Sequence, residues 1–294
     1  MTLNELLVRE HFDIENIIVL RHRPFEAGLA RVLPWLAAEH PGVFNAYQQT
    51  QGPALEKSML KIVDKGYIAS FLAYGAGRAI FVGLYAVKGS RPITLEQFWE
   101  IPEYQQMKEH GMQGFTASEG RPTIEQFDLE LLAFRSEWKG KLIIDWPGGE
   151  RSWWRRAENN NFTVQAILEQ SAFDEAMPKW NEFCLSWEQI KVLPSRWKNS
   201  LREWRGIYYI HDTSDNKAYI GSASGTENIL GRWQNYAASG HGTNKLLRER
   251  DPRNFKFSVL ERVSPDMNQS DLVTQENSWK VRLSTRHPCG LNDN

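Results

Sequence analysis

Polar and apolar positions are most clearly patterned near the carboxyl end of the chain, between residues 206 and 223. Apolar and aromatic residues fill Gly206-Ile207-Tyr208 and, after ten further residues, Tyr219-Ile220-Gly221. The span 211–217 between them is polar and rich in turn formers. Two such runs around a polar loop predict an antiparallel β-hairpin, which brings Tyr208 and Tyr219 close together on neighbouring strands.

Two helices are expected after this hairpin. The first opens at Leu230-Gly231-Arg232-Trp233, and Glu276 lies on the second. In the plainest interpretation, the second helix is amphipathic and pairs Glu276 with Lys280 four residues later.

The first two hundred residues predict a separate domain of short helices and several strands. Helical patterns cover 3–10 and 27–47, the second interrupted by Pro34 and by Pro41-Gly42. Strand patterns cover 16–20, 67–72, 78–87, 127–132 and 142–146. Gly83, within the strand pattern 78–87, suggests a bulge or a close backbone approach. Without a regular βαβ rhythm, these elements favour an antiparallel sheet or small open barrel.

Two basic stretches of this region are candidate nucleic-acid contacts. The run 21–24, Arg-His-Arg-Pro, is expected either as a solvated turn that stops the preceding strand or as a phosphate-contacting loop. Basic residues also alternate with tryptophans, which stack on bases or fill a core, at Arg151, Trp153, Trp154 and Arg155. A small barrel with aromatic residues near a strand end is similar to PUA-like and SRA-like modules, which implies a pocket for a modified base.

Composition places the chain among ordinary globular proteins, with 41% hydrophobic and 24% charged residues. Residues 200–294 contain 13 Lys+Arg against 11 Asp+Glu, and the remainder contains 22 against 25, so neither part is strongly basic and phosphate contacts depend on local patches. The two cysteines, Cys184 and Cys289, lack the spacing of a disulfide framework or a zinc site. The amino terminus lacks a secretory signal, and no apolar run is long enough to cross a membrane, which predicts a cytoplasmic location without membrane contact.

A break at 191–194, ending in Pro194, suggests the domain boundary, which divides the chain into 1–198 and 199–294. Residues of about 205 to 294 resemble a GIY-YIG endonuclease domain, a small antiparallel sheet flanked by helices. The resemblance rests on the two tripeptides after which the family is named, Gly206-Ile207-Tyr208 and Tyr219-Ile220-Gly221. It also rests on the residues that follow them in order, namely Arg232, Tyr236, Glu276 and Asn292. The chain as a whole is therefore expected to be α+β, and its carboxyl third a nuclease.

The resemblance implies a site that hydrolyses phosphodiesters with one metal ion. Glu276 is expected to hold Mg²⁺, for which Mn²⁺ can substitute. Arg232 is expected to stabilise the scissile phosphate. Tyr208 would accept the proton of the attacking water if its pKa were depressed, or else orient hydroxide. Tyr219 would hydrogen-bond Tyr208 or a phosphate oxygen.

The second proton-transfer residue stays open between Tyr236, at a position where relatives often have histidine, and His241. Lys245 is a candidate phosphate contact, and Asn292 is expected to pack near the site.

Together these residues predict a Mg²⁺-dependent DNA endonuclease of restriction type that serves in phage defence. The amino-terminal domain would choose the double-stranded DNA target, either from its sequence or through a modified cytosine. One site cuts one strand, so cleavage of both favours a homodimer or successive nicks. No small-molecule substrate is expected. The alternatives are a structure-specific repair nuclease and a non-catalytic nucleic-acid-binding protein.

Overall fold

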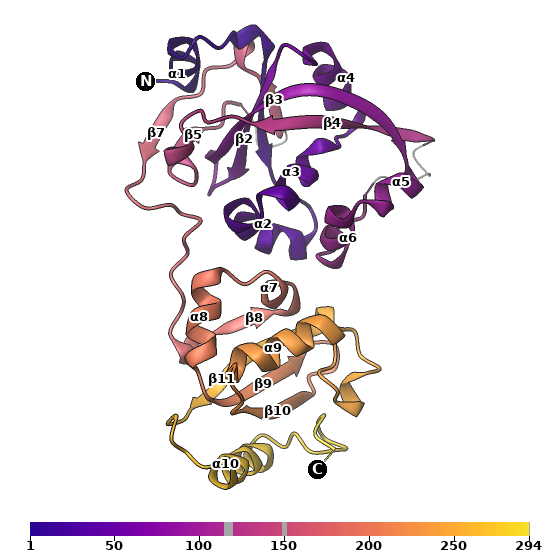
Figure 1. Ribbon diagram of the computed structural model, residues 1–294, viewed down its shortest axis with the longest axis vertical. Helices are drawn as coiled ribbons and strands as arrows, with labels where there is room; N and C mark the ends of the chain where they lie inside the picture. Colours follow the sequence, from indigo (N-terminus) through magenta and orange to yellow (C-terminus); the bar gives the residue numbers. More distant parts are fainter. Residues whose placement is uncertain (115–119, 149–151, 294) are drawn as a thin grey trace. The chain divides into compact units, whose positions relative to one another are not determined.

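The computed structural model describes residues 1–114, 120–148 and 152–293. The chain divides into two compact units, Met1–Glu175 and Ala176–Asn294 (Figure 1). The boundary thus lies earlier than the expected position near residue 198. The reason is that the short strand β8 (Cys184–Ser186) pairs with β11 (Phe255–Arg262) and so belongs to the sheet of the second unit.

The first unit is built on a curved mixed sheet with the strand order β6-β1-β2-β3-β5-β7, in which β4 also pairs with β3 (Figure 1). Its strands are β1 (Ile17–His22), β2 (Tyr67–Ala73), β3 (Arg78–Thr94), β4 (Thr123–Leu131), β5 (Leu142–Asp145), β6 (Trp154–Arg156) and β7 (Val164–Ile167). The long strand β3 holds the sheet together, because β5 pairs with its first residues and β4 with its second half. The expected α+β class and predominantly antiparallel sheet are confirmed.

One strand pair departs from the antiparallel expectation. β1 and β2 run parallel, with Ile17 opposite Tyr67. Parallel neighbours need a long crossover connection, and the helices between these strands provide it. They are α2 (Ala27–Glu39), α3 (Pro41–Gln49) and α4 (Pro53–Met59). The helix α2 continues through Pro34, and the expected break occurs only at His40, before Pro41.

The remaining helices of the first unit are α1 (Leu3–Arg9), α5 (Leu95–Glu100) and α6 (Pro102–Glu109). Thr2 begins α1 with a capping box, in which its hydroxyl accepts from the amide of Glu5 and the Glu5 carboxylate accepts from the amide of Thr2. Val82 is an extra residue opposite the register step between Ser70 and Phe71, so the bulge expected at Gly83 is confirmed beside it.

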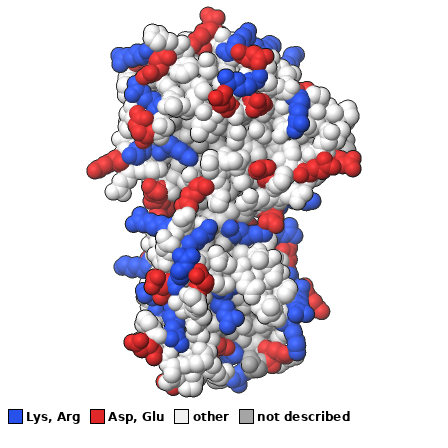
Figure 2. All heavy atoms as spheres, in the orientation of Figure 1, with Lys and Arg blue, Asp and Glu red and all other residues white. Residues whose placement is uncertain are grey.

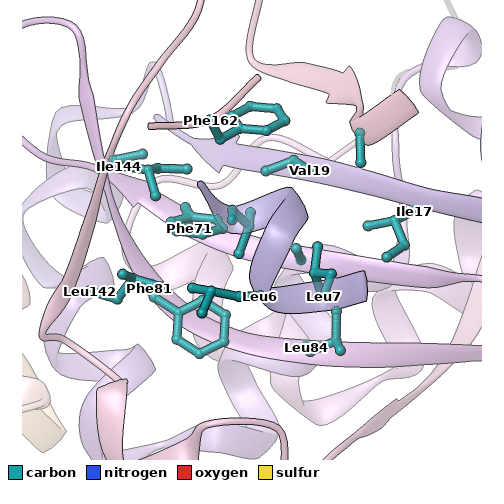
Figure 3. Packing of buried hydrophobic residues seen from close by; sticks show 14 of the residues in the cluster. Leu6, Leu7, Ile17, Val19, Phe71, Phe81, Leu84, Leu142, Ile144 and Phe162 are labelled. Atoms are coloured by element: carbon teal, nitrogen blue, oxygen red, sulfur yellow. The ribbon is translucent and has the colours of Figure 1, made fainter. Parts of the chain in front are cut away.

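A buried apolar cluster fixes α1 against the sheet (Figure 3). Leu6 and Leu7 of α1 contribute to it, with Val19, Phe71 and Phe81 from three neighbouring strands. These side chains are at most 5% exposed. Burial of each large aliphatic or aromatic side chain contributes roughly 1.5–3 kcal/mol, so this cluster is a main source of the unit's stability.

The expectation of a solvated turn or phosphate-contacting loop at 21–24 is wrong for its first two residues. Arg21 and His22 complete β1 and are buried, at 2% and 3% exposure. The guanidinium of Arg21 lies over the ring of Trp146, 5.0 Å from its centre. The strand therefore ends two residues later than the basic pattern suggests, at His22.

The second unit contains an antiparallel sheet of order β10-β9-β11-β8. The predicted hairpin is confirmed as β9 (Gly206–Asp212) and β10 (Ala218–Ala223). The accompanying helices are α7 (Trp187–Lys191), α8 (Ser195–Glu203), α9 (Asn228–Ser239) and α10 (Gln269–Arg282). Both helices predicted after the hairpin are thus present.

Charged side chains of both signs are interspersed on the visible face of each unit (Figure 2). This distribution agrees with the net charge of −1. Within the described ranges, no helix has the length and apolar content that crossing a bilayer requires.

Candidate active site

The hairpin register places two tyrosines on one face of the second sheet. Tyr208 of β9 lies opposite Gly221 of β10, and Tyr219 is two residues before Gly221. Since alternate residues of a strand share a face, both aromatic rings lie on the side of Gly221, with their centres 6.4 Å apart. The proximity predicted from the sequence is confirmed.

Gly221 leaves the space that the ring of Tyr208 occupies. A Cβ atom at this position would lie 2.4 Å from the Tyr208 hydroxyl oxygen and 3.0 Å from the ring of Tyr219. The last glycine of the hairpin motif therefore has a steric cause, because any side chain would displace the tyrosines.

We expect Gly221→Ala to lower the free energy of unfolding by about 1–3 kcal/mol, the usual cost of overpacking a filled site, and to lower any activity of the site. Thermal unfolding of the purified variant measures the first effect. Gly225→Ala is the matched control, since a Cβ there meets no atom within 4 Å. Equal melting temperatures for the two variants would contradict the steric argument.

A third tyrosine reaches the same place from α9. The hydroxyl groups of Tyr236 and Tyr208 are 3.3 Å apart, and the ring of Tyr236 lies 6.4 Å from that of Tyr219. Gly242, at a φ of +55°, packs closely against the Tyr236 ring. The three rings form a cluster, termed the tyrosine triad, in which Tyr208 and Tyr236 are buried and Tyr219 is partly exposed.

The environment of the triad keeps its two buried hydroxyl groups protonated. Burial raises the pKa of Tyr208 above its usual value, and Tyr219 adds to the rise, whereas the Tyr236 hydrogen bond and the charge of Arg232 oppose it. Burial and the two neighbouring tyrosines also raise the pKa of Tyr236. Tyr208 could accept a proton from water only if its pKa were depressed. The protein groups instead raise that pKa, because burial outweighs the nearby positive charge.

Arg232 is a cation whose charge acts on Tyr208 of the triad. It lies one helical turn before Tyr236 on α9, so the two side chains share a helix face. Its side chain is exposed, and within the described residues its guanidinium makes no ion pair or hydrogen bond. An arginine held close to buried hydroxyl groups with all its donors available is suited to binding an anion such as phosphate.

Glu276 approaches the hairpin from α10. Its Oε1 lies 2.8 Å from Nζ of Lys280, which confirms the predicted pairing, and its Oε2 accepts a hydrogen bond from the hydroxyl group of Ser222. Ser222 is adjacent to Gly221 on β10, the edge strand of the sheet. The charge of the carboxylate also contributes to the rise of the Tyr208 pKa.

Only one of the two hydrogen-bonding or ion-pairing partners of Glu276 was predicted from the sequence. Lys280 follows from helical spacing, but its burial, at 4% exposure, does not. Ser222 was missed altogether. Its signal is its place directly after the hairpin motif, where a small hydroxyl side chain interrupts the apolar arm.

Asn292 joins the end of the chain to the same edge strand. Its side-chain carbonyl accepts from the amide of Ile220 at 2.9 Å, and its amide donates to the Ile220 carbonyl at 2.8 Å. The residue is buried, at 1% exposure. These bonds satisfy the backbone amide and carbonyl of Ile220 on the edge strand β10, in agreement with the expectation that Asn292 packs near the site.

The loop after α9 contains the two further candidates. Nδ1 of His241 accepts a hydrogen bond from the amide of Thr243 at 3.0 Å, so the neutral ring bears its proton on Nε2. Lys245 is exposed and lies 3.7 Å from Asp293.

The basic and aromatic candidates at 151–155 belong to the first unit. Trp154 and Arg155 belong to β6, which pairs with β1, and Trp153 directly precedes that strand. Both tryptophans are partly buried and pack on an apolar cluster of the first unit. The guanidinium of Arg155 packs beside Gly148. Arg151 lies outside the described residues.

A metal ion at this site would depend on a single carboxylate. No group of three or more His, Cys, Asp or Glu side chains is arranged to hold a metal in the described parts of the chain. Glu276 is 16% exposed, and its two oxygen atoms have lone pairs beyond those that accept from Lys280 and Ser222. The donor therefore fits a hard cation such as Mg²⁺ that keeps most of its water.

No protein-family model and no curated protein matches the chain. One solved structure, that of the catalytic domain of the homing endonuclease I-TevI, is similar to part of it. The two share 26% sequence identity over 31% of this chain and 98% of that domain, with a TM-score of 0.26.

Proposed function

We propose that the second unit is a metal-dependent DNA endonuclease of the GIY-YIG kind that hydrolyses phosphodiester bonds. The observation that supports it best is the guanidinium of Arg232, which has no ion pair or hydrogen bond within the described residues and whose charge acts on Tyr208 of the tyrosine triad. A permanent positive charge that acts on the hydroxyl group of Tyr208, and a carboxylate hydrogen-bonded to the edge strand β10, both support the proposal.

Arg232 would bind the scissile phosphate and stabilise the charge that builds up on its oxygen atoms. A planar guanidinium presents two donors to one phosphate group. The exposure of the side chain lets DNA reach it without rearrangement of the unit.

Glu276 would hold the metal ion, with Lys280 and Ser222 fixing the orientation of its carboxylate. When bound, Mg²⁺ supplies Lewis-acid stabilisation of the phosphoryl group, and Mn²⁺ can replace it. The pairing with buried Lys280 and the serine hydroxyl restricts the carboxylate to one direction, which is what an outer shell of ligand partners provides.

The tyrosine triad would position the attacking water. As a protonated phenol, Tyr208 donates or accepts a hydrogen bond without itself being ionised, which favours the orienting role over proton abstraction. Tyr236 shares a hydrogen bond with Tyr208 and supports its position. His241, whose Nε2–H points away from its own loop bond, is the candidate donor to the leaving oxygen, with Lys245 as a phosphate contact.

The first unit would choose the DNA to be cut, so that the chain acts as a restriction enzyme in phage defence. The choice rests either on sequence or on a modified cytosine. Cleavage of both strands would require a homodimer or two successive nicks. Structure-specific repair is the second nuclease hypothesis, and it predicts cleavage of junctions and flaps regardless of modification. A non-catalytic binding role leaves the joint placement of Arg232 and Glu276 without a reason.

Parallel digestion of unmodified, cytosine-methylated, hydroxymethylated and branched DNA with Mg²⁺ tests this proposal. Cutting confined to modified DNA would identify the first unit as a selector of modified bases, and discrete fragments from unmodified DNA would identify sequence recognition. Preferential cutting of branched DNA would favour the hypothesis of a structure-specific repair nuclease over that of a restriction enzyme. Absence of metal-dependent cutting from every substrate would contradict the nuclease assignment.

A further inference from the structure

The first unit contains an open pocket that the proposed active site does not use. Its volume is about 830 Å³, within the range of roughly 300–1,000 Å³ typical of small-molecule sites. The described residues that line it come from the end of β1, the start of α2, the connection of α3 to α4, and segments near α5 and β4. It is large enough for one nucleotide and too small for a folded polymer.

The walls of the pocket are suited to a flat, uncharged ring. Tyr47, Phe98 and Trp153 contribute aromatic surface, on which bases stack. His22 and Gln51 contribute neutral polar groups, and both are buried. Burial lowers the pKa of His22 to about 4, so the imidazole stays neutral near pH 7. Nε2 of His22 is 3.2 Å from the hydroxyl of Ser70.

Positive charge also lines the pocket. Arg21, Arg23 and Arg121 are among its lining residues, with one carboxylate residue, Glu26. The guanidinium of Arg21 lies over Trp146, which is not a lining residue. Arg121 is anchored by two 2.6 Å hydrogen bonds to Glu56, which does not line the pocket. Aromatic walls with neighbouring guanidinium groups match the two parts of a nucleotide, a planar base and an anionic phosphate.

Phe25 distinguishes this pocket from an ordinary metabolite site. It lines the pocket and is nevertheless fully exposed, at 103%. The other exposed large hydrophobic side chains of the described chain reach at most 64%. Phe25 follows Pro24, whose ring restricts the backbone, and precedes α2. Proteins that kink DNA insert exposed apolar side chains such as phenylalanine between base steps.

We propose that Phe25 inserts into a DNA duplex and that the adjoining pocket holds the nucleotide that it displaces. The pocket, rather than a broad groove surface, would then be the element by which the first unit selects DNA. This inference rests on the proposed function only in taking DNA as the substrate. It requires no cleavage, so the two can fail independently.

Fluorescence of 2-aminopurine in short duplexes tests the inference, with the full chain in EDTA so that no strand is cut. The probe base is placed beside a central cytosine, 5-methylcytosine, 5-hydroxymethylcytosine or mismatched base, because extrusion of a base unstacks its neighbour. We expect the wild-type protein to raise the fluorescence several-fold on at least one duplex. Phe25→Ala should abolish most of this rise and weaken binding about tenfold, whereas Phe25→Leu should retain it, since leucine also serves as a wedge.

Tyr74→Ala is the matched control, an exposed aromatic residue of the same unit that does not line this pocket. It should behave as wild type. Because Phe25 is fully exposed, its replacement should leave the melting temperature unchanged. Trp153→Ala removes an aromatic wall of the pocket and should therefore reduce the fluorescence rise.

Three outcomes would overturn the inference. The first is duplex binding without a fluorescence rise on any of the four duplexes. The second is a rise that Phe25→Ala leaves intact. The third is tight binding of free deoxynucleoside monophosphates that duplex DNA does not displace, which would make the pocket a site for a free nucleotide. A fluorescence rise without any Mg²⁺-dependent cutting would retain the inference and contradict the proposed nuclease.

Discussion

Replacing Arg232 with alanine is expected to lower kcat/KM for DNA cleavage by about 10²–10³-fold, the usual effect of removing one preorganised donor to a developing charge. The guanidinium is exposed and has no partner within the described residues, so its loss removes a substrate contact rather than a structural one. Steady-state cleavage assays measure the effect, and the melting temperature should stay unchanged.

Two further substitutions on the same helix separate charge from geometry. Arg232→Lys should recover part of the loss, because it restores the charge but not the paired donors. Gln234→Ala, at an exposed position two residues later that faces another direction, should have no effect. An Arg232→Ala variant with wild-type kcat/KM would remove the main support for the proposed mechanism.

Replacing Glu276 with glutamine is expected to lower Mg²⁺-dependent cleavage by more than about 10³-fold, since a bound metal supplies several kcal/mol of charge stabilisation. The same substitution removes the ion pair between Glu276 and the buried ammonium of Lys280. The free energy of unfolding should therefore also fall, by about 1–3 kcal/mol. Cleavage assays and thermal unfolding measure the two effects separately.

A double variant distinguishes chemistry from folding at this position. Glu276→Gln combined with Lys280→Met removes both charges, so the stability lost in the single variant should largely return. Cleavage should not return, because the carboxylate is still absent. Recovery of cleavage together with stability would show that Glu276 is structural and would assign the metal elsewhere.

Local patterns were sufficient for much of the second unit. The hairpin, the helix of Arg232 and the helix of Glu276 all follow from apolar spacing and turn residues, which act over a few positions. The pairing of Glu276 with Lys280 follows in the same way from i,i+4 spacing. The hydrogen bonds of Asn292 to Ile220 could be expected only as proximity, since they join positions 72 residues apart.

The burial of individual side chains could not be predicted from local sequence patterns. Arginine is rarely fully buried unless paired, so the basic run at 21–24 suggested a surface turn, whereas Arg21 lies within the sheet over Trp146. The pKa of Tyr208 rises for the same reason, because its burial depends on Tyr236 and on the space at Gly221. The fully exposed Phe25 is the reverse case, since large aromatic side chains are usually at least partly buried.

The domain boundary illustrates a related limit. β8 is only three residues long, and its membership of the second sheet depends on pairing of Leu185 with Phe257. Such a short strand has no periodicity of its own, so Pro194 appeared to be the stronger boundary signal.

Single-turnover cleavage of the best DNA substrate, measured with and without Mg²⁺ at equal DNA occupancy, tests the central claim most directly. The wild-type protein should cut only with the metal. Arg232→Ala and the Glu276→Gln, Lys280→Met double variant should bind the DNA but cut it at least a hundredfold more slowly. Equal cutting rates for these three proteins, or cutting that persists in EDTA, would contradict the assignment of the site.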